Sequence, residues 1–167
     1  NDPMVKKFPT EAEIEGDLKL LAGKTNAIRT YTVEGVQARI PALAQKYGLN
    51  VTLGAWLGKD LETNEEQIET VIRLARENYK NVIRVVVGNE AIFRNDLTIQ
   101  QIGAYVDRVR HALDIPVSTA EPWHIWYKNP KLVNHVDFIA THMLPYWEGI
   151  HLDRAVDYVI EHVTLLQ

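Results

Sequence analysis

The sharpest chemical signal in the sequence is a pair of polar residues at the end of an apolar segment. Asn89 and Glu90 follow residues 82–87, in which Arg84 is the only polar side chain. A carboxyl group beside an apolar strand is partly desolvated, and desolvation favours the protonated form that a general acid needs. A neighbouring amide can bind a substrate hydroxyl group through a hydrogen bond that strengthens in the transition state. The pair therefore predicts Glu90 as a proton donor with Asn89 beside it, although Asn-Glu alone also suits a glutamate that caps a helix.

Further polar and aromatic residues follow the other strands that we expect, at the edge where α/β proteins bind ligands. Those expected to bind substrate are Arg29, Tyr31, Trp56, Glu121, Trp123, His142, Tyr146 and Trp147. All four tryptophans of the chain lie in these segments, and indole faces are well shaped to stack on the apolar faces of sugar rings. Together they favour a sugar-binding cleft over the alternative that each tryptophan only packs between loops.

Glu121 is the second carboxyl group that we expect at this edge. If it faced Glu90 across a pocket, the two would form the carboxylate pair of a glycosidase. A contact with a substrate hydroxyl group, or a purely structural role, is the simpler alternative for a residue on the neighbouring strand. We therefore place Glu121 among the substrate-binding residues and keep a nucleophilic role as an open alternative.

Other chemistries find little support in the sequence. The chain has no cysteine, and its six histidines lack the His-x-x-x-His and His-Glu-x-x-His spacings of metal sites. Residues 30–35 lack the glycine spacing of a dinucleotide-binding turn and the lysine of a P-loop, and no Gly-x-Ser-x-Gly segment marks a serine nucleophile. The 18 basic and 22 acidic residues are interspersed, without the basic stripe that binds nucleic acid. We therefore expect no metal, no cofactor and no nucleic-acid partner.

Five expected strands alternate with helices along the chain. We place the strands at residues 27–31, 50–56, 82–87, 116–120 and 136–142, and helices from near Thr10 and at about 40–47, 65–79, 98–113 and 152–163. Such βα units build either an open doubly wound sheet or a (β/α)8 barrel. The length of 167 residues favours the open sheet, because a complete barrel usually needs about 250, whereas the strand-end residues favour a barrel. No linker divides the chain, so we expect one domain over residues 1–167.

In their order along the chain, these segments resemble glycoside hydrolase family 17, the β-1,3-glucanases and β-1,3-glucanosyltransferases with (β/α)8 barrels. Residues 27–31 are similar to the second barrel strand with its arginine, residues 85–90 to the fourth with the acid/base glutamate, and residues 138–147 to the sixth. Residues 118–123 and 144–149 look most like the bacterial branch. The resemblance implies an incomplete barrel of about five βα units, from the second strand to the sixth.

By this resemblance, the parent domain is a retaining glycosidase or transglycosylase that acts on β-1,3-glucan, and Glu90 is its general acid and base. The nucleophile would lie on the seventh strand, in a Gly-Glu-x-Gly-Trp-Pro segment that this chain does not contain. Arg29 and Tyr146 would orient that nucleophile. The family also implies a secreted, periplasmic or cell-envelope location, and the chain itself shows neither a long apolar segment nor a signal pattern.

Two other interpretations stay open. One takes the chain as a catalytically inactive barrel fragment, or as a carbohydrate-binding remnant that keeps Trp56, Trp123 and Trp147. The other takes it as an open five-stranded α/β domain with an unrelated ligand. In an incomplete barrel, the second and sixth strands would each leave an unpaired edge, which invites self-association. We therefore expect the isolated chain to be oligomeric or prone to aggregation.

Overall fold

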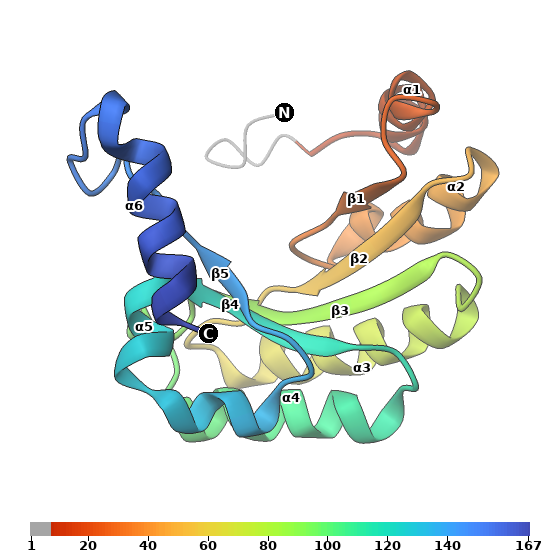
Figure 1. The fold of residues 1–167 in the computed structure, drawn as a ribbon. Coiled ribbons are helices and arrows are strands. Elements are labelled where there is room, and N and C mark those ends of the chain that lie inside the picture. Colours follow the sequence, from red (N-terminus) through yellow and green to blue (C-terminus); the bar gives the residue numbers. More distant parts are fainter. Residues whose placement is uncertain (1–7) are drawn as a thin grey trace.

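The computed structural model describes residues 8–167 as a curved parallel sheet with helices on its convex face (Figure 1). The five strands are β1 (Ala27–Arg29), β2 (Asn50–Ala55), β3 (Val82–Asn89), β4 (Val117–Pro122) and β5 (Ala140–His142), and they pair in sequence order. A doubly wound sheet reverses its strand order, whereas a (β/α)8 barrel does not. The expected incomplete barrel is therefore confirmed, and the doubly wound alternative does not apply.

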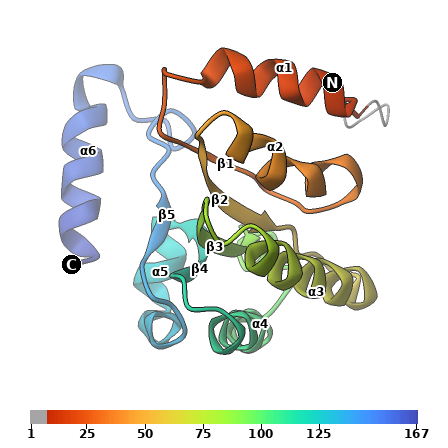
Figure 2. The same ribbon diagram turned by 90° about the vertical axis from the view of Figure 1, so that its right-hand side faces the viewer.

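Helices lie between successive strands and at both ends of the described chain, and α2, α3 and α4 cover the outside of the curve (Figure 1). They are α1 (Glu11–Leu21), α2 (Ile40–Lys46), α3 (Leu61–Glu77), α4 (Ile99–Ala112), α5 (Trp123–Lys128) and α6 (Leu152–Leu165), with the 3-10 helices η2 (Gly35–Arg39) and η3 (Pro130–His135). α2 packs on β2, α3 packs on β2 and β3, and α4 packs on β3 and β4. α1 and α6 lie towards opposite ends of the curve (Figure 2).

The hydrophobic core lies between the sheet and these helices. Val85 and Val87 of β3 are fully buried in it, with Leu53 of β2, Ile68 of α3 and Ile102 of α4. Alternate residues of a strand point to the same face, which places Val85 and Val87 together towards the helices. Burying each such side chain stabilises the fold by about 1.5–3 kcal/mol. The core therefore fixes β3, and with it the residues that follow the strand.

Side-chain caps set where the helices begin. Thr10, near which a helix was expected to start, forms a capping box with Glu13 at the start of α1, and Thr98 forms another with Gln101 at the start of α4. α3 begins at Leu61, before the expected start near residue 65, because Asp60 accepts hydrogen bonds from the N–H groups of residues 62 and 63. Asp60 is therefore a helix cap.

The connection between β4 and β5 differs from the sequence prediction. Residues that we expected to form a loop make α5 and η3, and β5 begins at Ala140 instead of residue 136. Asp137 explains the shorter strand: its carboxylate accepts hydrogen bonds from the Val117 N–H at 2.8 Å and from Arg110. A side chain thus takes the place of the regular ladder where β5 was expected to start.

Gly54 allows the backbone of Thr30 and Tyr31, which follow β1, to pass close to β2. A Cβ atom at Gly54 would lie 2.2 Å from the Thr30 carbonyl oxygen and 2.8 Å from the Tyr31 Cα atom. The Gly54 N–H also donates to the Thr30 hydroxyl group at 3.1 Å. Because the obstacle is backbone, it cannot rotate away. Gly54 therefore decides how Arg29 and Tyr31 approach the neighbouring strands.

We expect Gly54→Ala to lower the free energy of unfolding by about 2 kcal/mol or more, because the backbone of residues 30 and 31 must move. Gly16→Ala is the matched control, since no atom lies within 4 Å of a Cβ at that exposed position in α1. That substitution should stabilise the chain by about 0.5–1 kcal/mol. Urea unfolding of both variants measures the difference, and equal stabilities would contradict the close approach.

Both edges of the sheet are open among the described residues. β1 and β5 are the terminal strands. A groove of about 620 Å³ runs beside β1 past Ile28, and one of about 300 Å³ runs beside β5 past Ile139. On α6, Val156 and Ile160 point to solvent with exposed fractions of 69% and 59%. Unpaired edges and an uncovered apolar helix face both favour association.

Self-association of the isolated chain therefore stays our prediction. Static light scattering should give a mass above the 19.1 kDa of one chain, or visible aggregation. The double variant Val156→Lys/Ile160→Lys should reduce the apparent mass, because it places charge on the apolar face of α6. A monodisperse monomer of the unmodified chain would contradict the prediction.

Candidate functional site

Glu90 leaves the sheet through a backbone conformation that few residues with side chains adopt. Its φ is 57°, and Gly88, two residues earlier, has a φ of 81°. For a residue with a Cβ atom the left-handed region costs about 1 kcal/mol or more. The Glu90 N–H donates to the carbonyl oxygen of Ala120 at 2.7 Å, which ties the turn to β4. The chain therefore turns sharply at the residue that the sequence predicts as proton donor.

The Glu90 carboxylate meets a histidine from another strand. Glu90 Oε1 lies 2.6 Å from His142 Nδ1, and the two side chains are 25% and 19% exposed, respectively. Either the ring N–H donates to the carboxylate or the protonated carboxyl group donates to the ring nitrogen. One carboxyl oxygen is thereby fixed, and the other makes no hydrogen bond to residues 8–167. His142 thus contacts Glu90, and its predicted contact with substrate stays a prediction.

Asn89 is held from the edge strand. The Arg29 Nη2 group donates to Asn89 Oδ1 at 2.9 Å, and the Arg29 guanidinium lies 4.7 Å from the centre of the Tyr31 ring. The Arg29 Nε atom is buried without a hydrogen-bond partner among the described residues. The amide nitrogen of Asn89 makes no hydrogen bond to residues 8–167, so it can donate to a substrate. Tyr31 is half exposed beside it.

Glu121 lies beneath the turn that follows Glu90. Its side chain has no exposed surface, and its two oxygens accept hydrogen bonds from the N–H groups of Ile92 at 2.9 Å and Phe93 at 3.2 Å. Burial raises the pKa of Glu121 to about 7, against the lowering effect of these two hydrogen bonds. Both oxygens of Glu121 are thus engaged by backbone groups in this conformation. Its predicted contact with substrate stays a prediction.

Arg94 is a site residue that the sequence analysis missed. Its guanidinium donates to the carbonyl oxygens of Asn89 and of Leu57, the latter at 2.8 Å, and to Asp96 at 2.8 Å. The same group lies 4.5 Å from the centre of the Trp56 ring. Arg94 therefore fastens Trp56, which is 43% exposed, to the backbone beside Glu90. No motif marks this arginine, because two of its partners are backbone carbonyl groups, which any residue could supply, and one of them, Leu57, is distant in sequence.

The two tryptophans of α5 have structural contacts. Trp126 is 2% exposed and donates to the carbonyl oxygen of Ala140 at 3.1 Å, so it belongs to the core. The Trp123 Nε1 group donates to Glu148 at 3.2 Å, and the Trp123 ring centre lies 4.0 Å from that of His162 in α6. Tyr158 also donates to Glu148. Trp123 thus joins α5 to α6, and its predicted sugar contact stays a prediction.

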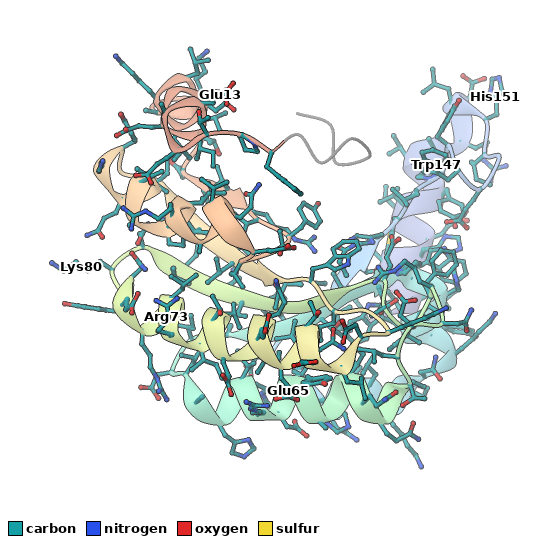
Figure 3. The ribbon with its side chains drawn as sticks, turned by 180° about the vertical axis from the view of Figure 1, so that it is seen from behind. Glu13, Glu65, Arg73, Lys80, Trp147 and His151 are labelled. Carbon is teal, nitrogen blue, oxygen red and sulfur yellow. The ribbon has the colours of Figure 1, made fainter. Side chains whose placement is uncertain are left out.

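Tyr146 and Trp147 lie on the loop that precedes α6. They are 85% and 78% exposed, and their rings contact each other at 5.8 Å between centres. Figure 3 shows Trp147 beside α6, on the arm that rises away from the sheet. The structure therefore brings together Arg29, Tyr31, Asn89, Glu90 and His142, with Trp56 attached through Arg94. It leaves Tyr146 and Trp147 on a separate arm.

The described part of the chain offers neither a metal cluster nor a membrane span. Among residues 8–167, no three His, Cys, Asp or Glu side chains converge as metal ligands would. In the same residues, no helix combines the length and apolar character that crossing a bilayer requires.

The raised pKa of Glu121 gives a pH dependence of stability. Between pH 4.5, its ordinary value, and about pH 7, the folded chain holds a proton that the unfolded chain has released. Stability therefore falls as the pH rises through this window, by up to about 3 kcal/mol. Urea unfolding of wild type and Glu121→Gln should show that the variant lacks this contribution. A constant difference between the two proteins from pH 4.5 to 7.5 would contradict the buried ionisation.

Comparison with known proteins places this site in a family. A model of the BtgE/BtgC glycoside hydrolase domain matches residues 2–167. The glucan 1,3-beta-glucosidase of Schizosaccharomyces pombe is 31% identical over 145 residues, which cover 80% of this chain and 45% of that protein. The probable glucan endo-1,3-beta-glucosidase btgC of Aspergillus clavatus is 29% identical over 92% of this chain and 24% of that protein. The chain thus spans less than half the length of these curated relatives.

Solved structures share the fold. The glycoside hydrolase family 17 β-1,3-glucanosyltransferase of Rhizomucor miehei has a TM-score of 0.84 and 28% identity, over 96% of this chain and 61% of that one. An endo-laminarinase from Formosa Hel1_33_131 has a TM-score of 0.83 at 18% identity, over 95% and 57% of the two chains, which shows the fold alone. Since the curated relatives above are fungal, the bacterial branch stays a prediction. The resemblance to family 17 is confirmed: this chain belongs to the BtgE/BtgC glycoside hydrolase domain family.

Proposed function

We propose that the enzyme containing this chain cleaves or transfers β-1,3-linked glucans by a retaining mechanism, with Glu90 as general acid and base. The observation that carries the proposal is the position of the Glu90 carboxyl group. It is partly exposed at the carboxyl end of β3, with one oxygen fixed by His142 and the other free. A general acid needs this combination of fixed orientation and access to the departing oxygen.

The names of the relatives support the choice of substrate. The Schizosaccharomyces pombe relative is a glucan 1,3-beta-glucosidase. An active-site mutant of the Rhizomucor miehei β-1,3-glucanosyltransferase was solved in complex with laminaritriose. Because this chain belongs to the same family and has aromatic rings at the same edge of its sheet, a β-1,3-glucan is the substrate that we assign to it.

The residues of the site divide the work of the reaction. The free oxygen of Glu90 protonates the departing glycosidic oxygen, and the resulting carboxylate then takes a proton from water or from a glucan hydroxyl group. Asn89 donates to a sugar hydroxyl group near the reacting carbon. The nucleophile would be a carboxylate about 5 Å from Glu90, supplied by a further strand of the barrel. Glu121 is not that nucleophile, because both of its oxygens are bonded to backbone N–H groups.

Aromatic residues would hold the glucan on either side of Glu90. Tyr31 and Trp56 present partly exposed rings next to Asn89, where a sugar close to the reacting bond would stack. Trp147 and Tyr146 lie on the other arm and would meet sugars further along the chain. A glucan polymer is too large to cross a membrane, so we place the enzyme outside the cytoplasm, secreted or at the cell envelope.

The test is turnover of laminarin by the full-length enzyme with and without Glu90→Gln. We expect the variant to lose about 10²–10⁴-fold in turnover, because the amide cannot donate the required proton. Sodium azide should restore turnover of a substrate with a good leaving group and give a β-glucosyl azide, the product that retention predicts. Product analysis of the wild-type reaction separates hydrolysis from transfer.

Glu66→Gln is the matched control, since Glu66 is an exposed glutamate on α3. It should leave turnover unchanged. If Glu90→Gln is as active as this control, Glu90 is not the acid/base group. If wild type binds laminari-oligosaccharides without turning them over, the protein is instead the carbohydrate-binding remnant that the sequence left open.

A further inference from the structure

Among the described residues, Glu121 is the only buried residue with a charged side chain, and its exposed fraction is zero. A carboxyl group in such a place costs free energy unless hydrogen bonds compensate for its lost hydration. Its compensation comes from a single source, the N–H groups of Ile92 and Phe93. The position of these donors is therefore the feature that explains the buried carboxyl group.

Ile92 and Phe93 belong to the tight turn that begins at Glu90. Two backbone hydrogen bonds close the turn. The Arg94 N–H donates to the Glu90 carbonyl oxygen at 2.8 Å, and the Asn95 N–H donates to the Ile92 carbonyl oxygen at 3.0 Å. The N–H groups of Ile92 and Phe93 lie in the first part of this turn, where they lack acceptors of their own, as at the start of a helix. The Glu121 carboxylate supplies those acceptors from the neighbouring strand.

β4 thus holds the chain on both sides of Glu90. Ala120 accepts the hydrogen bond from the Glu90 N–H at 2.7 Å, and Glu121 accepts those of the second and third residues after Glu90. Arg94 adds a further tie from the same turn to the carbonyl oxygen of Asn89. Because Glu90 itself has a strained left-handed backbone, external bonds of this kind are what keep it in place.

We propose that Glu121 is a positioning residue, which fixes the proton-donating geometry of Glu90 through the turn of residues 91–94. This inference rests on the acid/base role proposed for Glu90. It assigns Glu121 neither to the substrate nor to the nucleophile. Burial is the main cause of the raised pKa of Glu121 and the bonds to Ile92 and Phe93 lower it, whereas the nearby charges of Glu90 and Arg94 contribute less.

Glu121→Gln alters the hydrogen bonds to the Ile92 and Phe93 N–H groups, and it leaves the volume of the side chain almost unchanged. An amide offers one acceptor oxygen, and its NH₂ group faces the second N–H as donor against donor. The turn must then shift, and a displacement of about 1 Å at a catalytic group can cost about 10²-fold in rate. The loss should appear only in the step that needs protonation by Glu90.

The experiment compares two substrates in the full-length enzyme. We expect Glu121→Gln to lower kcat/KM for laminaritetraose by about tenfold or more, because its sugar leaving group needs a proton. The value for 2,4-dinitrophenyl β-laminaribioside, whose leaving group needs none, should change by less than about twofold. The ratio of the two values does not depend on how much of the variant is folded, so partial misfolding cannot imitate the result.

Thr119→Val is the matched control. Thr119 is buried two residues earlier on β4, and its hydroxyl group makes no hydrogen bond in the described structure. This variant should leave the ratio unchanged. An equal loss on both substrates in Glu121→Gln, or no loss on either, would overturn the positioning role.

Glu90→Gln separates the two proposals. It should change the ratio more strongly than Glu121→Gln does. If Glu90→Gln leaves the ratio unaltered, the acid/base assignment itself fails, and the positioning role falls with it. If Glu90→Gln changes the ratio and Glu121→Gln does not, only the positioning role is lost.

Discussion

The site depends on the irregular end of the β3–β4 ladder. Regular pairing shifts between Val86 and Asn89, where Gly88 adopts a positive φ. A Cβ atom at Gly88 would lie 3.2 Å from the Ile102 Cδ1 atom of α4, a tight contact, but the positive φ is the main reason for glycine here. The shift brings the Glu90 N–H to Ala120 and turns the chain out of the sheet. Without it, Glu90 would continue the alternation of the strand.

The other residues of the site follow from that turn. His142 reaches Glu90 from β5 across β4, which the parallel register of Pro122 with His142 permits. Arg94 lies four residues after Glu90 and extends back to Asn89, so the same turn positions Trp56. Three strands and one turn thus hold a single carboxyl group. Tyr146 and Trp147 depend on a different structure, the cluster of Glu148, Trp123 and α6.

The architecture and the strand-end residues could be predicted from the sequence because they depend on local patterns. The apolar residues of β3 and the alternation of strands with helices predicted a parallel sheet, and Thr10 marked the start of the first helix. Contacts between distant segments left no such pattern. Arg94 binds the carbonyl oxygen of Leu57, and any residue could supply that oxygen. The shortened β5 depends on Asp137 and Arg110, whose pairing the sequence does not mark.

Glu90 and Glu121 show most clearly why sequence alone could not assign the two carboxyl groups. Each comes at the end of an expected strand, and each has a candidate binding residue within two positions, Asn89 for Glu90 and Trp123 for Glu121. Glu121 still lies within β4, all of whose residues are buried. Glu90 comes one residue after β3 ends, where its left-handed backbone turns the chain out of the sheet and leaves the side chain 25% exposed. The position relative to the strand end, just after β3 or still within β4, therefore separates a carboxyl group that can meet substrate from one that supports the backbone beneath it.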